Sequence, residues 1–339
     1  MIGDYLREVM NGQAIPGLSV GVAIGGRRVF VAGFGMANLE HGVAASSGTV
    51  YEVASLTKTF TAALILLLAH EGRLKLDSPV TDYVGQLPDA WKDVTLRHIL
   101  THVSGLPSYT SEEKFWEETR RDWSPRDIIA LVAARDLLYK PGTDHHYDNT
   151  GYILLGLVVE EVTGQDFAEA LVERVLDPLD MADTMMNDLR AVVPNRAAGY
   201  VAGEEAPENR DWYAPSRAWS AGALLSTVTD LMKWEAALHG HGHLPPQVID
   251  LMRAPVELPA KAVRSGAQHG ISHGWFFPYV DGHPAMGHSG GILGFSSIML
   301  RFLKENVTVA MLFNSTNVER PDLVAKNVAG YFRKSLKAA

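Results

Sequence analysis

The sequence holds a serine and a lysine at a spacing that suits nucleophilic catalysis. Ser55 and Lys58 form the pattern S-x-x-K in the stretch EVASLTKTF, where a loop is expected to become a helix. Three residues are about one helical turn, so the lysine amine can reach the serine hydroxyl. Serine is a weak nucleophile without an adjacent base, and a lysine desolvated against an apolar helix can be partly neutral and act as that base. The structural alternative is that Ser55 only caps the helix.

A second S-x-x-K copy and a different serine motif compete with this hypothesis. Ser111 and Lys114 repeat the spacing, but they lie in a charged, polar stretch and are expected on a solvated face. GHSGG at 287–291 matches the G-x-S-x-G nucleophile elbow around Ser289. That elbow requires a following helix and a downstream histidine, whereas ILGFSSIMLRF is typical of a strand and no histidine follows Ser289. We therefore predict that GHSGG is a glycine-rich strand edge.

Two further stretches hold side chains that would complete a site around Ser55. Tyr147 and Asn149 belong to YDN, which is the only Y-x-N in the chain. A tyrosine beside a lysine can relay a proton, and an asparagine can bind a substrate amide. The alternative is an ordinary turn, because Asp-Asn before Gly-Tyr is common in loops. His288 and Gly290 form H-x-G, where glycines let a substrate approach the strand backbone.

Strands are expected at both ends of the chain, with helices between them. LSVGVAI and RRVFVAGFG, at 18–24 and 27–35, indicate a hairpin with the two-residue turn Gly25-Gly26. Helical periodicity follows in FTAALILLLAHEG and continues to about residue 260. Strand patterns return in GISHGWFFPYV (270–280), FSSIMLRFL and VTVAMLFN, before a closing helix at 321–337.

This order predicts an α+β fold with one antiparallel sheet built from both ends of the chain, flanked by helices, and an inserted mainly helical domain. We predict a discontinuous α/β sheet domain of residues 1–56 and 270–339 and a helical domain of residues 57–269. The motifs come from both, so the active site is expected at their interface. Residues 203–215 are polar and are predicted to form a surface loop.

Composition excludes several classes of function. The 339 residues are 47% apolar and 20% charged with a net charge of -9, which argues against nucleic acid or an anionic membrane as partner. The absence of cysteine excludes disulfides, thiolate zinc sites and cysteine nucleophiles. The longest apolar run, 62–69, is too short to span a bilayer. HGHGH at 239–243 predicts a helix end rather than a metal site, so we expect neither metal nor cofactor.

The first 17 residues can be compared with the pattern of a secretory signal peptide. MIGDYLREVMNGQAIPG has no apolar segment after a basic start, unlike a signal peptide. We therefore expect a cytoplasmic protein, or a periplasmic or secreted one if the natural chain begins further upstream. The sequence does not indicate an oligomeric state.

The ordered motifs S-x-x-K, Y-x-N and H-x-G resemble the serine β-lactamase and penicillin-binding-protein superfamily, in its class C β-lactamase-like branch. That branch includes family VIII carboxylesterases, D-stereospecific aminopeptidases and D-alanyl-D-alanine carboxypeptidases. LRHILTHVSGLPSY and WSAGALLSTVTDLMKW are similar to further segments of the family. The resemblance covers roughly residues 14 to 315 and implies a β-lactamase/transpeptidase-like fold.

By this resemblance, Ser55 attacks a carbonyl and forms an acyl-enzyme, while Lys58 and Tyr147 handle its proton. Either of these two can be the base, because coupled groups titrate as a unit. The oxyanion would lie between the backbone N–H groups of Ser55 and Gly291, on the strand edge that includes Gly290. Asn149 would hold the acyl-side amide of the substrate or orient Lys58.

His288 stands where many lactamases and transpeptidases carry lysine, a fixed positive charge for the substrate carboxylate, so the resemblance implies that His288, like Gly290 and Gly291, binds substrate. Histidine is mostly neutral at pH 7 when unperturbed. We therefore expect a small-molecule substrate, a carboxylic ester or a small amide, rather than a carboxylate-bearing lactam. The alternatives are a D-stereospecific aminopeptidase, a DD-peptidase, a weak β-lactamase or, in another class, a non-catalytic binding or scaffold protein on the same fold. Four aromatic residues on expected loops are candidates for an acyl pocket: Tyr109, Trp212, Tyr213 and Trp219.

Overall fold

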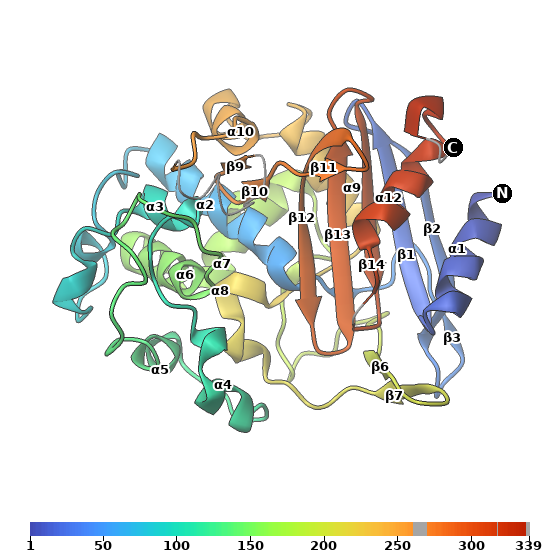
Figure 1. The fold of residues 1–339 in the computed structure, drawn as a ribbon, viewed down its shortest axis with the longest axis horizontal. Helices are drawn as coiled ribbons and strands as arrows, with labels where there is room; N and C mark the ends of the chain where they lie inside the picture. The colour runs from blue at the N-terminus through green and yellow to red at the C-terminus, as the bar shows by residue number, and fades with distance from the viewer. Residues whose placement is uncertain (260–269, 317, 337–339) are drawn as a thin grey trace.

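The computed structural model describes residues 1–259, 270–316 and 318–336. Its main element is an antiparallel sheet that both ends of the chain form together, on the right of Figure 1. Within the described residues, nine strands run in the order β3-β2-β1-β14-β13-β12-β10-β9, with β11 paired to β12. Their bounds are β1 Gly17–Ile24, β2 Arg27–Asn38, β3 Val43–Ala44, β9 Ile271–Ser272, β10 Trp275–Phe276, β11 Tyr279–Val280, β12 His283–Ile292, β13 Phe295–Phe302 and β14 Val307–Phe313.

The pairing of β1 with β14 brings the two ends of the chain together, with Leu18 opposite Phe313. Side chains of a strand point alternately to the two faces of its sheet. In β14, Val309 and Met311 therefore enter one hydrophobic core, while Ala310 and Leu312 enter the other. The alternating apolar pattern that predicts these strands is thus explained by a sheet that is covered on both faces.

Helices from distant parts of the sequence cover the two faces of the sheet. α1 (Ile2–Gly12) contacts β2 and α12 (Pro321–Gly330) contacts β13 and β14, and both lie beside the chain ends in Figure 1. α9 (Val228–Leu238) contacts β1, β2 and β14 from the opposite face. The closing helix predicted at 321–337 ends earlier, at Gly330, and residue 337 lies outside the described residues.

The helical region packs around α2 (Thr57–His70), whose residues are buried from Thr57 to Leu68. A helix that is apolar on every side belongs inside a core. It contacts α6 (Thr150–Thr163), α8 (Trp219–Gly222) and α10 (Pro246–Arg253). The other elements are α3 Leu96–Leu100, α4 Glu113–Glu117, α5 Pro125–Ala130, α7 Phe167–Leu171, β4 Tyr51–Glu52, β5 Met185–Met186, β6 Tyr200–Ala202, β7 Pro207–Asn209 and β8 Leu224–Ser226.

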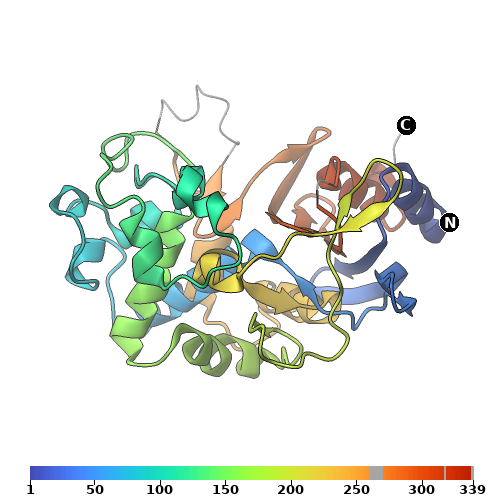
Figure 2. The ribbon, with the colours of Figure 1, turned by 90° about the horizontal axis from the view of Figure 1, so that it is seen from below.

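The helical region and the sheet lie side by side, which Figure 2 shows from below. The 3₁₀ turn that precedes α2 contacts β12 and β13, so the start of the central helix meets the sheet. The predicted α+β class with an antiparallel sheet and flanking helices is confirmed. The boundaries of the two domains stay a prediction, and residues 260–269 and 337–339 lie outside the described residues.

Two local predictions are wrong. The segment 203–215 is not only a surface loop, because β7 within it pairs with β6, and Tyr213 and Ala214 are buried. Strands of three residues are too short to show a periodic pattern. The single strand expected at 270–280 is instead three two-residue strands, because Gly274 adopts a φ of 84° and Pro278 lacks the N–H that a ladder needs.

Candidate active site

Ser55 lies in a one-turn 3₁₀ helix, Ala54–Leu56, that leads directly into α2. Ala54 has a φ of 48°, a left-handed conformation that costs an alanine about 1 kcal/mol. The Ser55 Oγ accepts hydrogen bonds from Lys58 Nζ at 3.2 Å and from the Tyr147 hydroxyl at 2.9 Å. Side chains from two distant motifs therefore meet at this one hydroxyl.

Lys58 is fully buried on the first turn of α2. Besides Ser55, its Nζ donates hydrogen bonds to Asn149 Oδ1 at 2.8 Å and to the Ala221 carbonyl at 2.7 Å. Burial disfavours the ammonium and lowers the pKa of Lys58 to about 7, although the Asp148 carboxylate acts in the opposite direction. A substantial fraction of the amine is therefore unprotonated at neutral pH.

Tyr147 lies just before α6 and directs its hydroxyl at Ser55. The Tyr147 ring packs against the His102 ring at a centroid distance of 4.5 Å. Lys58 Nζ lies 5.0 Å from the centroid of the Tyr147 ring. Desolvation raises the pKa of Tyr147 well above the ordinary tyrosine range. The phenol is therefore protonated at neutral pH and donates its proton in the hydrogen bond to Ser55.

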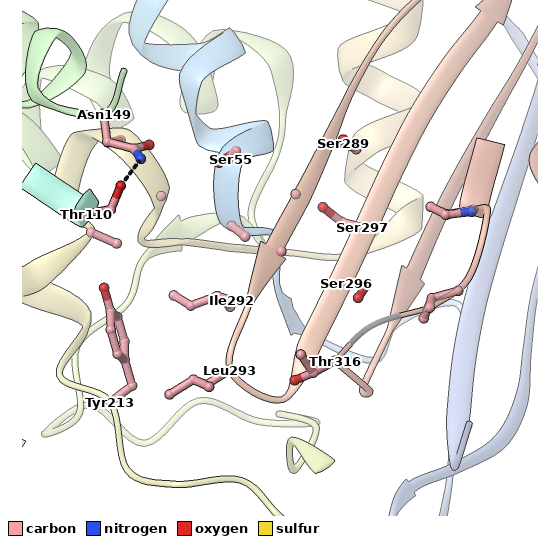
Figure 3. Close-up of a pocket in the computed structure, with 18 of the residues that line it drawn as sticks. Ser55, Thr110, Asn149, Tyr213, Ser289, Ile292, Leu293, Ser296, Ser297 and Thr316 are labelled. Carbon is pink, nitrogen blue, oxygen red and sulfur yellow. Dashed lines mark hydrogen bonds between the residues drawn. The ribbon is translucent and has the colours of Figure 1, made fainter. Parts of the chain in front are cut away.

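Asn149 connects Lys58 to the wall of a cavity. Its Oδ1 accepts from Lys58, and its Nδ2 donates to Thr110 Oγ1 at 3.2 Å, the dashed line in Figure 3. Ser108 Oγ lies 3.4 Å from the same nitrogen. Two roles were considered for Asn149, and its hydrogen bond with Lys58 favours the one in which it orients Lys58. The Asn149 amide also lines the cavity.

The predicted H-x-G residues lie on β12, beside the 3₁₀ turn that carries Ser55. A Cβ on Gly290 would lie 2.3 Å from the Val53 carbonyl oxygen and 2.9 Å from the Ser55 backbone nitrogen, so only glycine fits there. A Cβ on Gly291 would meet nothing within 4 Å, so that position opens onto the cavity.

His288 differs from its glycine neighbours, because its side chain is 5% exposed and does not line the described cavity. Burial, followed by the charge of Lys58, lowers the pKa of His288 to about 3. Its Nδ1 lies 2.6 Å from the Ser289 carbonyl oxygen, so this nitrogen carries the proton of a neutral ring. His288 therefore supplies no positive charge at neutral pH.

A cavity of about 550 Å³ opens over Ser55. In Figure 3, Ile292 and Leu293 point toward Tyr213, below Ser55 and Asn149. The described lining residues include no Asp, Glu, Lys, Arg or His; they are Ala54, Ser55, Tyr109, Thr110, Trp116, Asn149, Tyr213, Ala218, Ala221, Gly222, Ser289, Gly290, Gly291, Ile292, Leu293, Ser296, Ser297, Thr316, Val318 and Pro321. The cavity is therefore uncharged along its described wall.

With this geometry in view, the chain can be compared with known proteins. The Beta-lactamase family model matches residues 2–330. The chain belongs to the beta-lactamase family. The match confirms the resemblance and extends it beyond residues 14 to 315 at both ends. It also confirms the β-lactamase/transpeptidase-like fold.

The individual relatives share less than a third of their aligned residues with this chain. Protein flp from Staphylococcus aureus (strain MW2) is 29% identical over 320 residues, which are 91% of this chain and 62% of that protein. The chain thus spans less than two thirds of that relative's length. The octameric penicillin-binding protein homologue from Pyrococcus abyssi is 27% identical, with a TM-score of 0.82. That alignment covers 98% of this chain and 76% of the homologue's chain. A D-stereospecific amidohydrolase from Streptomyces sp. is 27% identical, with a TM-score of 0.77. That alignment covers 93% of this chain and 94% of the amidohydrolase chain.

Of the four aromatic residues predicted to line an acyl pocket, two line the cavity over Ser55 and two do not. Tyr109 and Tyr213 line the cavity, whereas Trp212 and Trp219 do not. Trp219 lies on α8, a short helix that the sequence pattern did not reveal, and its ring packs on Phe167. Trp212 is 52% exposed. Among the larger lining side chains that sequence reasoning did not assign to the pocket are Trp116, Ile292 and Leu293, of which the last two directly follow GHSGG.

The two remaining sequence motifs, GHSGG and HGHGH, lie in a strand and directly after a helix. Ser289 lies in β12, which a turn joins to β13, so its context is strand–turn–strand rather than that of a nucleophile elbow. HGHGH begins directly after α9, and His239 lies 2.9 Å from the Glu235 carboxylate. Within the described residues, no three His, Cys, Asp or Glu side chains are grouped to hold a metal ion. None of the described helices has the length and apolar character of a membrane span.

Proposed function

We propose that the chain is a serine hydrolase that cleaves uncharged carboxylic esters, or small amides, through an acyl-enzyme on Ser55. The observation that carries the proposal is the double contact at the Ser55 Oγ, from Lys58 Nζ at 3.2 Å and from the Tyr147 hydroxyl at 2.9 Å. A nucleophilic serine needs a base within hydrogen-bond reach, and these contacts meet that requirement.

In the proposed acylation, neutral Lys58 takes the Ser55 proton while Oγ bonds to the substrate carbonyl carbon. The carbonyl π electrons move to its oxygen and form a tetrahedral oxyanion. When the intermediate collapses, the bond to the leaving group breaks, and that group takes a proton from Tyr147, which Lys58 then reprotonates. Water releases the acid by the same steps in reverse order. Lys58 is the better candidate for the base, because desolvation lowers its pKa and raises that of Tyr147.

The oxyanion would bind between the backbone N–H groups of Ser55 and Gly291. The close approach of Gly290 to the Ser55 nitrogen supports this placement, since it brings the strand edge against the 3₁₀ turn. Each donor of such a pair is worth about 3 kcal/mol of barrier. The glycines at 290 and 291 would also leave the strand backbone accessible to a substrate.

The uncharged wall of the cavity supports the proposed substrate class. A charged group moved from water into a site without a counter-charge loses solvation free energy that nothing replaces. The described lining offers no carboxylate for the α-ammonium of an aminopeptidase substrate and no cation for the carboxylate of a lactam or peptidoglycan peptide. Tyr109, Trp116 and Tyr213 instead offer aromatic surface to an apolar acyl group.

A second candidate is a D-stereospecific amidase, because one of the relatives of known structure is a D-stereospecific amidohydrolase that aligns along almost its whole length. DD-peptidase and weak β-lactamase activity stay further alternatives. The discriminating experiment is a panel of p-nitrophenyl esters, D- and L-amino acid anilides and nitrocefin, run on the native protein and on Ser55→Ala. Ester turnover that Ser55→Ala abolishes supports the proposal, while D-anilide turnover above ester turnover favours the amidase.

A non-catalytic scaffold is tested in the same samples. Absence of turnover on the whole panel, together with no covalent labelling by a fluorophosphonate probe, would favour the scaffold alternative.

The role of His288 is tested by restoring a positive charge. His288→Lys is expected to raise the ratio of nitrocefin to p-nitrophenyl ester turnover by about tenfold, the value of one charged hydrogen bond. His288→Gln, which stays neutral, is the matched control and should leave the ratio near the native value. If His288→Lys also leaves the ratio unchanged, the missing charge does not explain substrate choice.

A further inference from the structure

Asp148 is a buried carboxylate next to the groups that contact Ser55, and the mechanism above does not use it. It stands between Tyr147 and Asn149 and is fully buried. Its Oδ1 accepts a hydrogen bond from the Gly151 backbone N–H at 2.5 Å, and its Oδ2 accepts one from Ser104 Oγ at 3.2 Å. A buried carboxylate is strongly unfavourable unless other groups stabilise its charge.

Direct ion pairing does not supply that stabilisation. In the described ranges, no arginine or lysine forms an ion pair with Asp148, and His102 is the one basic side chain within 4 Å of its carboxylate, with Nδ1 3.8 Å from Oδ2. That same nitrogen accepts the Asp148 backbone N–H at 3.3 Å, so it carries no proton. Burial also lowers the pKa of His102, and the ring is neutral.

The neighbouring ionisable groups that burial shifts are uncharged near pH 7. Desolvation lowers the pKa of His145 to about 4 and that of His288 to about 3. It raises the pKa of each tyrosine that faces Asp148. The facing groups are His102 from the segment after α3, Tyr139, His145 and Tyr147 from the segment before α6, Tyr152 from α6 and His288 from β12. Asp148 is therefore the carboxylate of a buried cluster in which its chain neighbour Asn149 accepts a hydrogen bond from Lys58 Nζ at 2.8 Å, and His102, 3.8 Å from its Oδ2, packs on the Tyr147 ring.

We propose that Asp148 is a positioning residue for proton transfer, whose carboxylate stabilises the Lys58 ammonium that forms when Lys58 takes the Ser55 proton. The inference rests on the proposed function. In that step the Ser55 O–H bond breaks, the Lys58 lone pair binds the proton, and the negative charge passes through Oγ to the carbonyl oxygen. The site thus gains a positive charge on Lys58, whose Nζ contacts Asn149, the chain neighbour of Asp148. The same carboxylate disfavours a Tyr147 phenolate, which would place two negative charges on adjacent residues.

The structural alternative is that Asp148 only caps α6 through the Gly151 N–H. Asp148→Asn separates the two roles, because asparagine keeps an oxygen that can cap the helix but has no charge. Asp148→Ser is a second neutral variant that can cap, in case Asp148→Asn does not fold. Asp230→Asn is the matched control: Asp230 is also buried, and its Oδ2 accepts hydrogen bonds from the Asp183 backbone N–H and the Thr184 hydroxyl, but it lies on α9 and is paired with Lys233.

The test measures kcat/KM against pH for a neutral p-nitrophenyl ester. The acid limb is the part of the profile in which kcat/KM falls as the pH is lowered. Removal of the Asp148 charge should move this limb to lower pH by about one unit, which is the smallest pKa shift typical of a neighbouring opposite charge. The plateau should fall roughly threefold, because a less basic amine is a weaker general base. Asp230→Asn should leave the limb in place even if it lowers the melting temperature. An acid limb that does not move in Asp148→Asn or Asp148→Ser overturns the proposal.

A second readout does not require turnover. In protein labelled with lysine ¹³Cε, the Lys58 resonance, assigned by its loss in Lys58→Met, reports the amine titration directly. Its midpoint should fall by about one pH unit in Asp148→Asn relative to the native chain. A shifted midpoint without ester turnover would refute the proposed function while supporting the link between Asp148 and Lys58. An unshifted midpoint would refute that link whatever the turnover.

Discussion

The chain contains S-x-x-K twice, and the two copies have opposite surroundings. Lys58 is fully buried, and its Nζ makes three hydrogen bonds, one of them to the Ser55 Oγ. Ser111 and Lys114 are both exposed, the first at the end of a 3₁₀ turn and the second in α4. Identical spacing therefore produces one set of interacting groups and one solvated face.

Burial rather than spacing accounts for the difference. The start of α2 is enclosed by α6, α8 and the sheet, so Lys58 loses its hydration and its pKa falls to about 7. Water surrounds the Lys114 ammonium. A motif of two residues can specify only that the side chains are able to meet. The rest of the fold decides whether the lysine is dehydrated enough to accept a proton.

The most direct way to break this comparison is to remove each serine. Ser55→Ala should lower kcat/KM for a p-nitrophenyl ester by roughly 10⁴-fold or more, since no hydroxyl remains to carry the acyl group. Ser111→Ala, the matched control, should stay within about twofold of the native value, because its side chain is exposed and is not among the described residues that line the cavity. Mass spectrometry of fluorophosphonate-treated protein should locate the adduct on Ser55. Comparable losses in both variants would show that burial does not distinguish the copies.

The lysines give the next largest effect. Lys58→Met keeps a long unbranched side chain but removes the amine, and kcat/KM should fall roughly 10³-fold with the loss of general base catalysis. Its melting temperature at pH 7 should fall below that of the native chain, because the Asn149 amide oxygen and the Ala221 carbonyl lose their buried hydrogen-bond donor. Lys114→Met should change neither quantity. Retention of more than a tenth of the activity by Lys58→Met would assign the base to another group.

The burial of Lys58 also predicts a dependence of activity and stability on pH. Below about pH 7, kcat/KM should fall tenfold per pH unit as the amine becomes protonated. The folded-state pKa of Lys58 lies below its ordinary value of 10.5, so between about pH 7 and 10.5 the unfolded chain binds more protons. The free energy of unfolding should therefore rise with pH across this window.

Urea unfolding at pH 7 and pH 9 measures this effect. The native chain should gain stability relative to Lys58→Met by about 1.4 kcal/mol per pH unit. Lys114→Met should follow the native chain. A constant difference between the native chain and Lys58→Met would mean that Lys58 is not desolvated in the folded protein.

The sequence could predict the parts of the site that depend on residue type and order. Ser55, Lys58 and Tyr147 belong to recognisable patterns, and the structure places their side chains within contact distance. The strands of the hairpin and of the last two sheet segments show regular apolar alternation, so they too were predictable.

The rest depends on packing between distant segments, which no local pattern records. Y-x-N leaves its middle residue open, so no sequence pattern indicated that Asp148 is buried. Trp219 was assigned to a loop because α8 is four residues long. His288 was expected to contact substrate, yet its burial follows from the way β12 packs near Phe276 and Tyr147, which the sequence does not reveal.

The smallest predicted effect concerns the backbone that presents Ser55. Ala54 and Ala14 both adopt a left-handed conformation, with φ of 48° and 50°, but only Ala54 precedes the candidate nucleophile. Replacement of alanine by glycine at a positive φ should raise the free energy of unfolding by about 0.5 kcal/mol at either position. Ala54→Gly should in addition lower kcat roughly three- to tenfold, because a freer backbone holds the hydroxyl less accurately between Lys58 and Tyr147. Ala14→Gly should leave kcat unchanged. If Ala54→Gly is stabilised to the same extent and keeps its full kcat, the strained conformation has no part in directing Ser55, and the contrast between the two S-x-x-K copies rests on burial alone.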